Sequence, residues 1–225
     1  MENMLARRGF AATLRVATDM ESTVAAWAAL PCPGTMTELV PAPPALIGAG
    51  LTSLAVHAAA GCRGRIAWFD PGDRLDPCGA SRASLDLGQL LWLRGGEAVT
   101  ALRAALLVLQ AGGFELIVLD LLDQPETSLR FPRVAWFRLL RALERERRTA
   151  LLVLAPRPLS GTCANRVYGV RYVDWRWDSS ARLLLGSVHI EMQLQASRRA
   201  LPARRPPTSV LDATLDITLD GESVA

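Results

Sequence analysis

The sequence predicts an α/β fold: a mainly parallel sheet flanked by helices, with antiparallel strands toward the C-terminus. Three observations predict it. Short, continuously apolar runs alternate with longer segments of helical periodicity up to residue 155. Such runs are typical of strands buried on both faces of a parallel sheet. Beyond residue 155, strand-like segments follow one another without intervening helices, which is typical of hairpins.

Five apolar runs predict the strands of the parallel part. They are Met36–Val40, Arg65–Asp70, Leu90–Leu93, Glu115–Leu121 and Thr149–Ala155. Helical segments separate most of them, and a strand-helix-strand unit closes as a right-handed crossover between parallel strands. We therefore expect one sheet with helices on both of its faces.

Three helices are predicted between the strands. Thr52–Ala60 is almost wholly apolar. Glu97–Ala111 is stopped by Gly112-Gly113, and Pro132–Arg148 has a strongly basic side. The apolar face of the second helix comprises Val99, Leu102, Ala105, Leu106 and Leu109, and the polar face of the third comprises Arg138, Arg141, Arg145 and Arg148.

The C-terminal third predicts strands at Val167–Trp175, Arg182–Leu194 and Val210–Leu219. Ser197–Thr208 has four arginines and three prolines, and it is typical of a linker or exposed loop. The expected organisation is an N-terminal helical segment (1–30), an α/β core (31–195), this Arg/Pro-rich linker or loop (196–208), and a C-terminal strand with a tail (209–225).

Length and composition indicate a globular protein. Half of the 225 residues are hydrophobic, which is enough for one ample core. No apolar run approaches the roughly 20 residues that span a bilayer, and Met1–Arg15 lacks the layout of a signal peptide. We expect a cytoplasmic protein without membrane contact. The four cysteines form no C-x-x-C pair, so we expect no metal site and no disulfide framework.

All 25 basic residues are arginine, and the net charge is +3. Several arginines are adjacent in sequence, as at Arg147-Arg148. This basicity is compatible with nucleic-acid binding, and weak, salt-sensitive DNA contacts through arginine clusters remain an option. Codon usage in a GC-rich genome explains the absence of lysine equally well.

A degenerate phosphate-binding loop stands between the first predicted strand and the first predicted helix. A working loop reads G-x-x-x-x-G-K-[ST], in which backbone N–H groups and the lysine hold phosphates and the hydroxyl holds Mg²⁺. Here the first glycine position is Ala45 and the lysine position is Leu51; only Gly50 and Thr52 fit. Three prolines just upstream remove backbone donors. We expect no ATP binding at this loop.

The order of further motifs resembles the RecA family of recombinases over most of residues 36 to 195. Ala67–Pro77, which ends in Leu-Asp-Pro, resembles the family's strand-end motif. Leu85–Trp92 followed by Glu97-Ala98 resembles the segment that leads into the next helix, and Leu116–Asp120 resembles the Walker B strand. The resemblance implies a RecA-like P-loop NTPase core in which Asp120 would hold the water shell of Mg²⁺.

Two departures from that family argue against catalysis. The position of the family's catalytic glutamate is Gly72, which has no side chain to act as a base. With Leu51 at the lysine position, the cation is missing as well, and losing both should add several kcal/mol to the barrier. Gly50, Leu51, Thr52, Ser53 and Asp120 are then vestigial cofactor positions, and Asp120 has an alternative role as a cap for the following loop.

The segment after the last parallel strand also departs from the recombinases. Pro156–Gly161 is short and contains two prolines where the family has a long DNA-binding loop, so we expect no filament-type strand exchange. Gly161–Asn165 still resembles the re-entry point after that loop.

Among small RecA relatives with these losses, this sequence most resembles the ImuA type of bacterial damage-response proteins. The resemblance implies a non-catalytic adaptor in SOS-induced translesion synthesis, cytoplasmic and associated with the nucleoid after damage. Its implied partners are an ImuB-type, Y-family polymerase-like protein, RecA and, indirectly, an error-prone C-family polymerase. Two alternatives stay open: a SulA-like inhibitor of a tubulin-like GTPase, and a residual nucleotide-binding protein or slow ATPase in which an arginine replaces the lysine.

Three segments are candidate interaction surfaces, each with a structural alternative. Leu5–Leu30 fits a helix for self-association or RecA contact, or one that covers its own domain. Trp175-Arg176-Trp177 fits either a surface for single-stranded DNA or core packing. The C-terminal unit, Arg198–Asp220, fits either a strand that docks on another protein or an ordinary last strand of the domain. Its proposed contact residues are Arg198, Arg199, Arg204, Arg205, Leu211, Leu215, Ile217 and Leu219.

Overall fold

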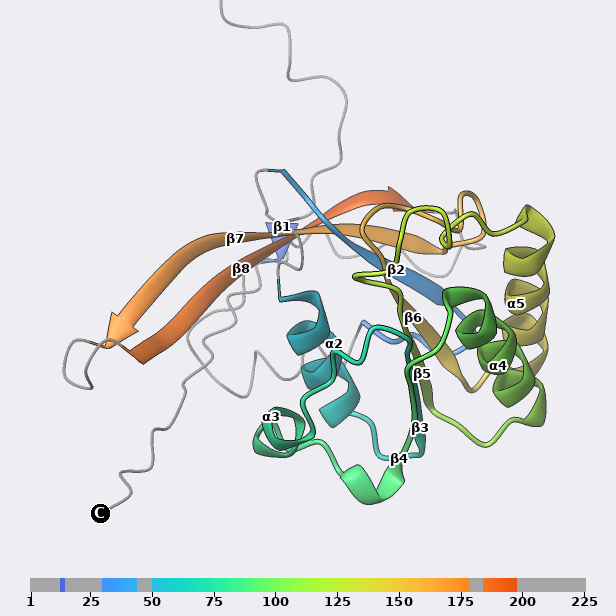
Figure 1. Cartoon of the computed structure of the whole chain (residues 1–225), viewed down its shortest axis with the longest axis horizontal. Coiled ribbons are helices and arrows are strands. Elements are labelled where there is room, and N and C mark those ends of the chain that lie inside the picture. The colour runs from blue at the N-terminus through green and yellow to red at the C-terminus, as the bar shows by residue number, and fades with distance from the viewer. Residues whose placement is uncertain (1–12, 15–29, 44–49, 179–183, 198–225) are drawn as a thin grey trace, which may run out of the picture.

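One eight-stranded sheet organises the described part of the chain, which comprises residues 13–14, 30–43, 50–178 and 184–197 of a computed structural model (Figure 1). The strand order is β1-β8-β7-β2-β6-β5-β3-β4. The strands are β1 Thr13–Leu14, β2 Met36–Pro41, β3 Ile66–Asp70, β4 Leu90–Arg94, β5 Leu116–Asp120, β6 Ala150–Leu154, β7 Arg166–Asp178 and β8 Leu184–Ser197. The helices are α2 Leu51–Ala60, α3 Pro77–Arg82, α4 Ala98–Ala111 and α5 Arg133–Glu146.

The five predicted parallel strands are confirmed as β2 to β6, with ends that shift by one residue at most. All their neighbours pair in parallel, and β7 joins β2 in parallel as well. The predicted helices are confirmed as α2, α4 and α5. The short helix α3 was not among our predictions. It follows from the Leu-Asp-Pro turn, because Asp76 accepts hydrogen bonds from the N–H groups of Cys78 and Gly79, and Pro77 suits the first helical position.

Two separate hydrophobic cores lie on the two faces of the sheet. α2 and α3 cover one face, and α4 and α5 cover the other (Figure 1). Alternate residues of each central strand enter opposite cores: Trp68 packs with α2, whereas Ala67 and Phe69 pack with α4. Because the central strands are buried on both faces, they appear in the sequence as unbroken apolar runs.

β7 and β8 form a long antiparallel ribbon that extends away from the two helical layers (Figure 1). This confirms the expected antiparallel C-terminal part. β8 reaches Ser197, so the first two residues of the expected linker belong to a strand. The strand predicted at Val210–Leu219 lies outside the described residues. Trp175 and Trp177 are on β7, but their side chains are also outside the described part.

The N-terminal segment was expected to be helical, and at Thr13–Leu14 this expectation is wrong. These two residues form β1, which pairs antiparallel with Gln193 and Met192 of β8. An open edge of β8 supplies backbone partners that a helix would not use. The rest of Leu5–Leu30 lies outside the described residues, except for Leu30, which is buried in the core.

The short loop after β6 is fastened to β2 by a buried carboxylate. Glu38 is fully buried and accepts hydrogen bonds from the N–H groups of Leu159 and Ser160, at 2.9 and 3.0 Å, and from the Ser160 hydroxyl at 2.9 Å. Asn165 exchanges two 2.8 Å hydrogen bonds with the backbone of Met36. The loop is therefore fastened to β2 at its middle and at its C-terminal end, while Pro156–Pro158 remain exposed.

Candidate functional site

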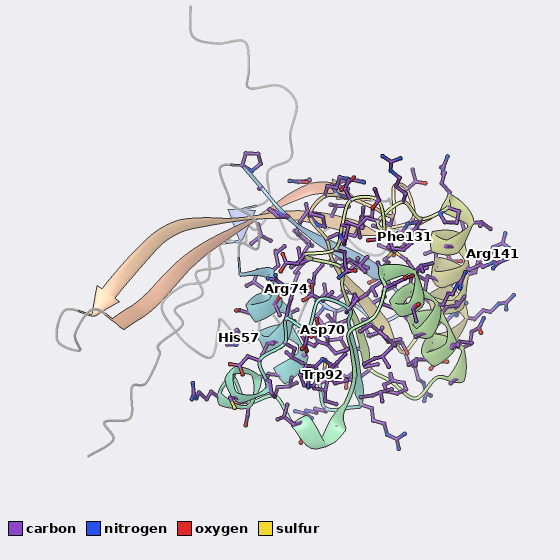
Figure 2. All side chains as sticks on the ribbon, in the orientation of Figure 1. His57, Asp70, Arg74, Trp92, Phe131 and Arg141 are labelled. Carbon is purple, nitrogen blue, oxygen red and sulfur yellow. The ribbon has the colours of Figure 1, made fainter. Side chains whose placement is uncertain are left out.

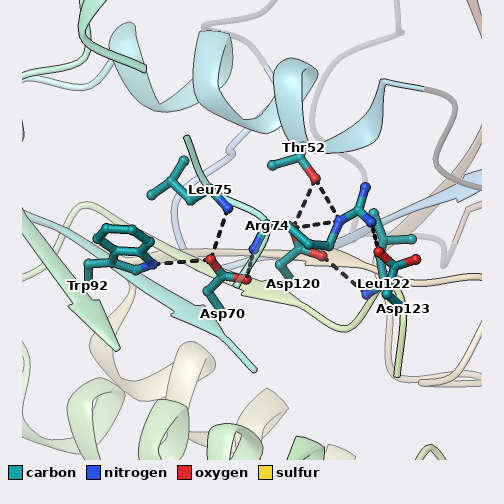
Figure 3. Close-up of polar contacts among 8 residues, drawn as sticks. All are labelled: Thr52, Asp70, Arg74, Leu75, Trp92, Asp120, Leu122 and Asp123. Carbon is teal, nitrogen blue, oxygen red and sulfur yellow. Dashed lines mark hydrogen bonds and ion pairs between the residues drawn. The ribbon is translucent and has the colours of Figure 1, made fainter. Parts of the chain in front are cut away.

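The carboxyl ends of β3 and β5 bring two fully buried carboxylates close together. Asp70 ends β3, Asp120 ends β5, and the two strands are paired neighbours (Figure 3). The carboxyl edge of a parallel sheet is where ligands of α/β proteins usually bind. The start of α2 and the loop after β3 close over this edge, so these segments decide what the two carboxylates can bind.

Asp70 serves as a structural acceptor. Its Oδ1 accepts from the N–H of Arg74 at 2.9 Å, and its Oδ2 accepts from the N–H of Leu75 at 3.0 Å and from the indole N–H of Trp92 at 3.2 Å. These three donors hold the turn after β3 and join it to β4. A buried carboxylate with its lone pairs engaged in this way fixes the loop.

Asp120 faces α2 across the edge of the sheet. The Thr52 hydroxyl donates to Asp120 Oδ2 at 3.0 Å, and the N–H of Leu122 donates to Oδ1 at 3.1 Å. Burial raises the pKa of Asp120 to about 7, against the lowering effects of these hydrogen bonds and of the Arg74 charge. The hydrogen bond to the Leu122 N–H is the loop-capping role that was the alternative for this residue.

Arg74 places a guanidinium at the same point. Its Nε lies 3.4 Å from Thr52 Oγ1 and 3.9 Å from Asp120 Oδ2, and its terminal nitrogen forms an ion pair with Asp123 (Figure 3). The side chain is 22% exposed, so most of it is packed against these partners. Thr52, Asp120 and Asp123 therefore surround a cation that the chain itself supplies.

The lysine position of the predicted loop points elsewhere. Leu51 is fully buried and packs in the core under α2. Gly50 begins α2 with a φ of 66°, which is the left-handed region that glycine adopts readily. Ser53 is exposed on the helix and makes no contact with Asp120. Of the five vestigial positions, the structure therefore brings only Thr52 and Asp120 into contact.

Gly72, the position that the resemblance assigns to a catalytic glutamate, is crowded. A Cβ atom built at Gly72 would lie 3.1 Å from the backbone oxygen of Leu122 and 3.4 Å from Cγ of Arg74. These distances are shorter than most carbon contacts, so a side chain here would require one of the two neighbours to move. The turn that carries Gly72 is packed for a residue without a side chain.

Among the described residues, those that would hold Mg²⁺ with ATP are engaged with one another; the loop segment 44–49 lies outside the described residues. Holding them would need a hydroxyl and a carboxylate free to face Mg²⁺ and its water shell, and a cation directed at the phosphates. Here Thr52 donates directly to Asp120, Arg74 takes the neighbouring space, and the lysine position is an apolar core residue. The donor set is satisfied within the protein.

An exposed ion pair borders the site. Arg94 makes two 2.8 Å hydrogen bonds to the carboxylate of Asp73, and its guanidinium lies 4.5 Å from the centre of the Trp92 ring. Asp73 has a φ of 52° in the tight turn after β3. The Arg94 partner lowers the pKa of Asp73.

Arg74 and Glu38 are the important polar residues that we did not predict. Arg74 lies inside the strand-end motif, but its partners Thr52 and Asp120 come from α2 and β5. Their proximity depends on β3 pairing with β5, which the sequence does not state. The only signal in the sequence is a charged residue between Asp70 and the Leu-Asp-Pro turn.

The proposed partner-binding arginines and leucines beyond residue 197 lie outside the described residues. Within the described part of the chain, no three His, Cys, Asp or Glu side chains are grouped as a metal site would need. None of the described helices combines the length and apolar character needed to cross a membrane.

The fold can be compared with known proteins. No known family profile matches the sequence, and no curated protein matches it in sequence. Among solved structures, the crystal structure of the RadB recombinase is similar, with a TM-score of 0.51, 12% sequence identity, and coverage of 74% of this chain and 83% of that chain. At this identity the likeness concerns the fold alone. The chain has a RecA-like α/β fold, with its helical layers and antiparallel C-terminal ribbon on one mainly parallel sheet.

Proposed function

We propose that this chain is a non-catalytic, RecA-like adaptor that works by binding other proteins. One observation carries the proposal: the contact between Thr52, Asp120 and Arg74 at the carboxyl edge of the sheet. Residues that would bind Mg²⁺ and phosphate in an active relative are engaged with one another here. In this proposal, a RecA-like protein without a usable nucleotide site acts by binding other proteins through its surface.

Two further features support an adaptor over a motor. Gly72 provides no base, and the space for one is restricted by Leu122. The loop after β6 is short and held by Glu38 and Asn165, whereas a mobile DNA-exchange loop would have to move. These features concern the base and the loop, whereas the contact between Thr52, Asp120 and Arg74 concerns the binding of Mg²⁺ and phosphate.

The process that we propose is SOS-induced translesion DNA synthesis. Its support is the order of the RecA-like motifs together with the altered lysine and loop, which resemble ImuA-type proteins. In this proposal, the chain binds an ImuB-type polymerase-like protein and RecA, and an error-prone C-family polymerase joins through the ImuB-type protein. The cellular setting is the cytoplasm, with nucleoid association after DNA damage.

The test is a binding comparison with three purified candidates: an ImuB-type protein, RecA and a tubulin-like GTPase. We expect micromolar or tighter binding to the ImuB-type protein, measured by calorimetry without nucleotide and unchanged when ATP and Mg²⁺ are added. Binding to the GTPase alone would replace this proposal with the SulA-like alternative. Binding that requires ATP would contradict the adaptor proposal and support the residual nucleotide-binding alternative.

A further inference from the structure

Six exposed arginines lie along α5 and its C-terminal end. Arg147 donates a hydrogen bond to the backbone oxygen of Glu144, and we call the other five the arginine face: Arg133, Arg138, Arg141, Arg145 and Arg148. Figure 2 shows Arg141 on the outer side of α5, far from Arg74 and Asp70 beside α2. The opposite side of α5 is buried in the core. This surface is therefore separate from the candidate site described above.

The charges of the arginine face are not balanced by the described part of the protein. None of the five side chains forms an ion pair or hydrogen bond there, whereas Arg74, Arg94 and Arg157 each have an acidic partner. α5 has two acidic residues, of which Glu144 is exposed and Glu146 is half-buried. Arg138, Arg141 and Arg145 are spaced by three and four residues, so their like charges repel along the helix. A bound polyanion would relieve that repulsion.

The geometry suits a phosphate chain. α5 from Arg133 to Glu146 is about 20 Å long, and one strand of nucleic acid carries a charge about every 3.4 Å when its bases are stacked. The face therefore matches about six consecutive phosphates. Arginine is well suited to this contact because its planar guanidinium forms paired hydrogen bonds to phosphate oxygens.

Exposed apolar side chains lie between these arginines. Phe137 is 40% exposed and Val134 is 54% exposed, and both are on the outer side of α5. Phe137 stands four residues from Arg133 and four from Arg141, so the ring is flanked by guanidiniums along the helix. An exposed ring among cations offers a stacking surface for an unpaired base.

We propose that the arginine face of α5 binds single-stranded nucleic acid, with the arginines on the phosphates and Phe137 against a base. The proposal is independent of the adaptor function, because it uses neither the nucleotide site nor the partner proteins. The proposed binding surface is on a helix, and the short loop after β6 takes no part in binding the nucleic acid.

The experiment measures binding of the full chain to a labelled single-stranded oligothymidylate by fluorescence anisotropy over a NaCl series. The face variant changes Arg138, Arg141 and Arg145 to Gln. The matched control changes Arg63, Arg65 and Arg82 to Gln, which removes the same charge from exposed positions elsewhere. We expect the face variant to bind about tenfold more weakly or worse, and to lower the slope of log K against log salt by about 2. The control should keep the wild-type slope.

Two further variants separate charge, stacking and folding. Changing Arg138, Arg141 and Arg145 to Lys should restore the salt slope, which excludes a merely unfolded face variant. Phe137→Ala should weaken binding about tenfold at an unchanged slope, because stacking releases no counterions. The proposal is overturned if the wild type does not bind, or if the face and control variants lose equal affinity. It is also overturned if polyglutamate binds as tightly as the oligonucleotide and Phe137→Ala affects neither, which would identify an acidic protein as the ligand.

Discussion

Arg74 and Arg141 show two opposite uses of the same side chain. Arg74 is packed among Thr52, Asp120 and Asp123 at the carboxyl edge of the sheet, and its charge is neutralised within the protein. Arg141 stands on the outer side of α5 without an acidic partner in the described structure. In the first arrangement the guanidinium is engaged within the protein, and in the second it is available to a ligand. We expect that substituting an arginine with an acidic partner lowers the free energy of unfolding. Substituting one without such a partner should weaken the binding of a ligand instead.

The largest expected effect comes from restoring the missing lysine. Leu51→Lys places an amine in the core under α2, where Leu51 is fully buried without a polar partner. Burying an unpaired ionisable group should lower the free energy of unfolding by about 4 kcal/mol or more. Urea unfolding at neutral pH measures this loss.

Leu107→Lys is the matched control, because Leu107 is 66% exposed on α4. It should change the free energy of unfolding by less than about 0.5 kcal/mol. If Leu51→Lys were as stable as this control and bound ATP, position 51 would face the carboxyl edge, and the site would be open after all.

The next effect is a pH dependence that originates at Asp120. Because burial raises its pKa to about 7, the folded state keeps a proton that the unfolded state, with an ordinary pKa near 4, has already released. The contribution of Asp120 to stability is therefore greatest below pH 4 and is lost as pH rises to about 7, with a slope of at most about 1.4 kcal/mol per pH unit.

Asp120→Asn removes this titration while keeping a side chain of the same shape. We expect its urea-unfolding stability to match the wild type near pH 4 and to exceed it by a few kcal/mol at pH 8, as an order of magnitude. The contrary result would be that the free energies of unfolding of the two proteins change in parallel with pH. Asp120 would then have an ordinary pKa, and the charge of Arg74 would offset the effect of burial on it.

A smaller contrast compares the two arginines directly. Arg74→Ala leaves Asp120 and Asp123 without their cation, and it should destabilise the fold by about 1–2 kcal/mol. Arg141→Ala should change the free energy of unfolding by less than about 0.5 kcal/mol. Arg74→Met keeps much of the apolar stem, so it separates lost charge from lost packing. Equal effects of the two alanine variants in urea unfolding would contradict the contrast.

Much of this fold could be predicted because its signals are local. Strands such as Leu116–Asp120 are unbroken apolar runs, and the helix Ala98–Ala111 ends at a glycine pair. The polar contacts of Arg74 and Glu38 could not be predicted, because each joins segments that are far apart in the sequence and neighbours only in space. The expected N-terminal helix failed at Thr13–Leu14 for the same reason, since the partner of that strand is β8, far along the chain.

The candidate site was predictable in its chemistry and not in its geometry. From Leu51 and Gly72 the sequence predicted a site without the cation and the base. The hydrogen bond from Thr52 to Asp120, beside the guanidinium of Arg74, could not be predicted from these residues alone. It depends on the pairing of β3 with β5 and on the position of α2. The contact of Arg74 with Thr52 and Asp120 is recognised only when the strands are placed.

The most direct test of the central claim is calorimetric titration of the purified chain with ATP and Mg²⁺, with hydrolysis and melting temperature measured on the same samples. The closed site predicts no binding heat, no turnover and no change in melting temperature, with or without single-stranded DNA. Micromolar binding with turnover would contradict the account. It would show that Arg74 either moves aside for a nucleotide or binds its phosphates.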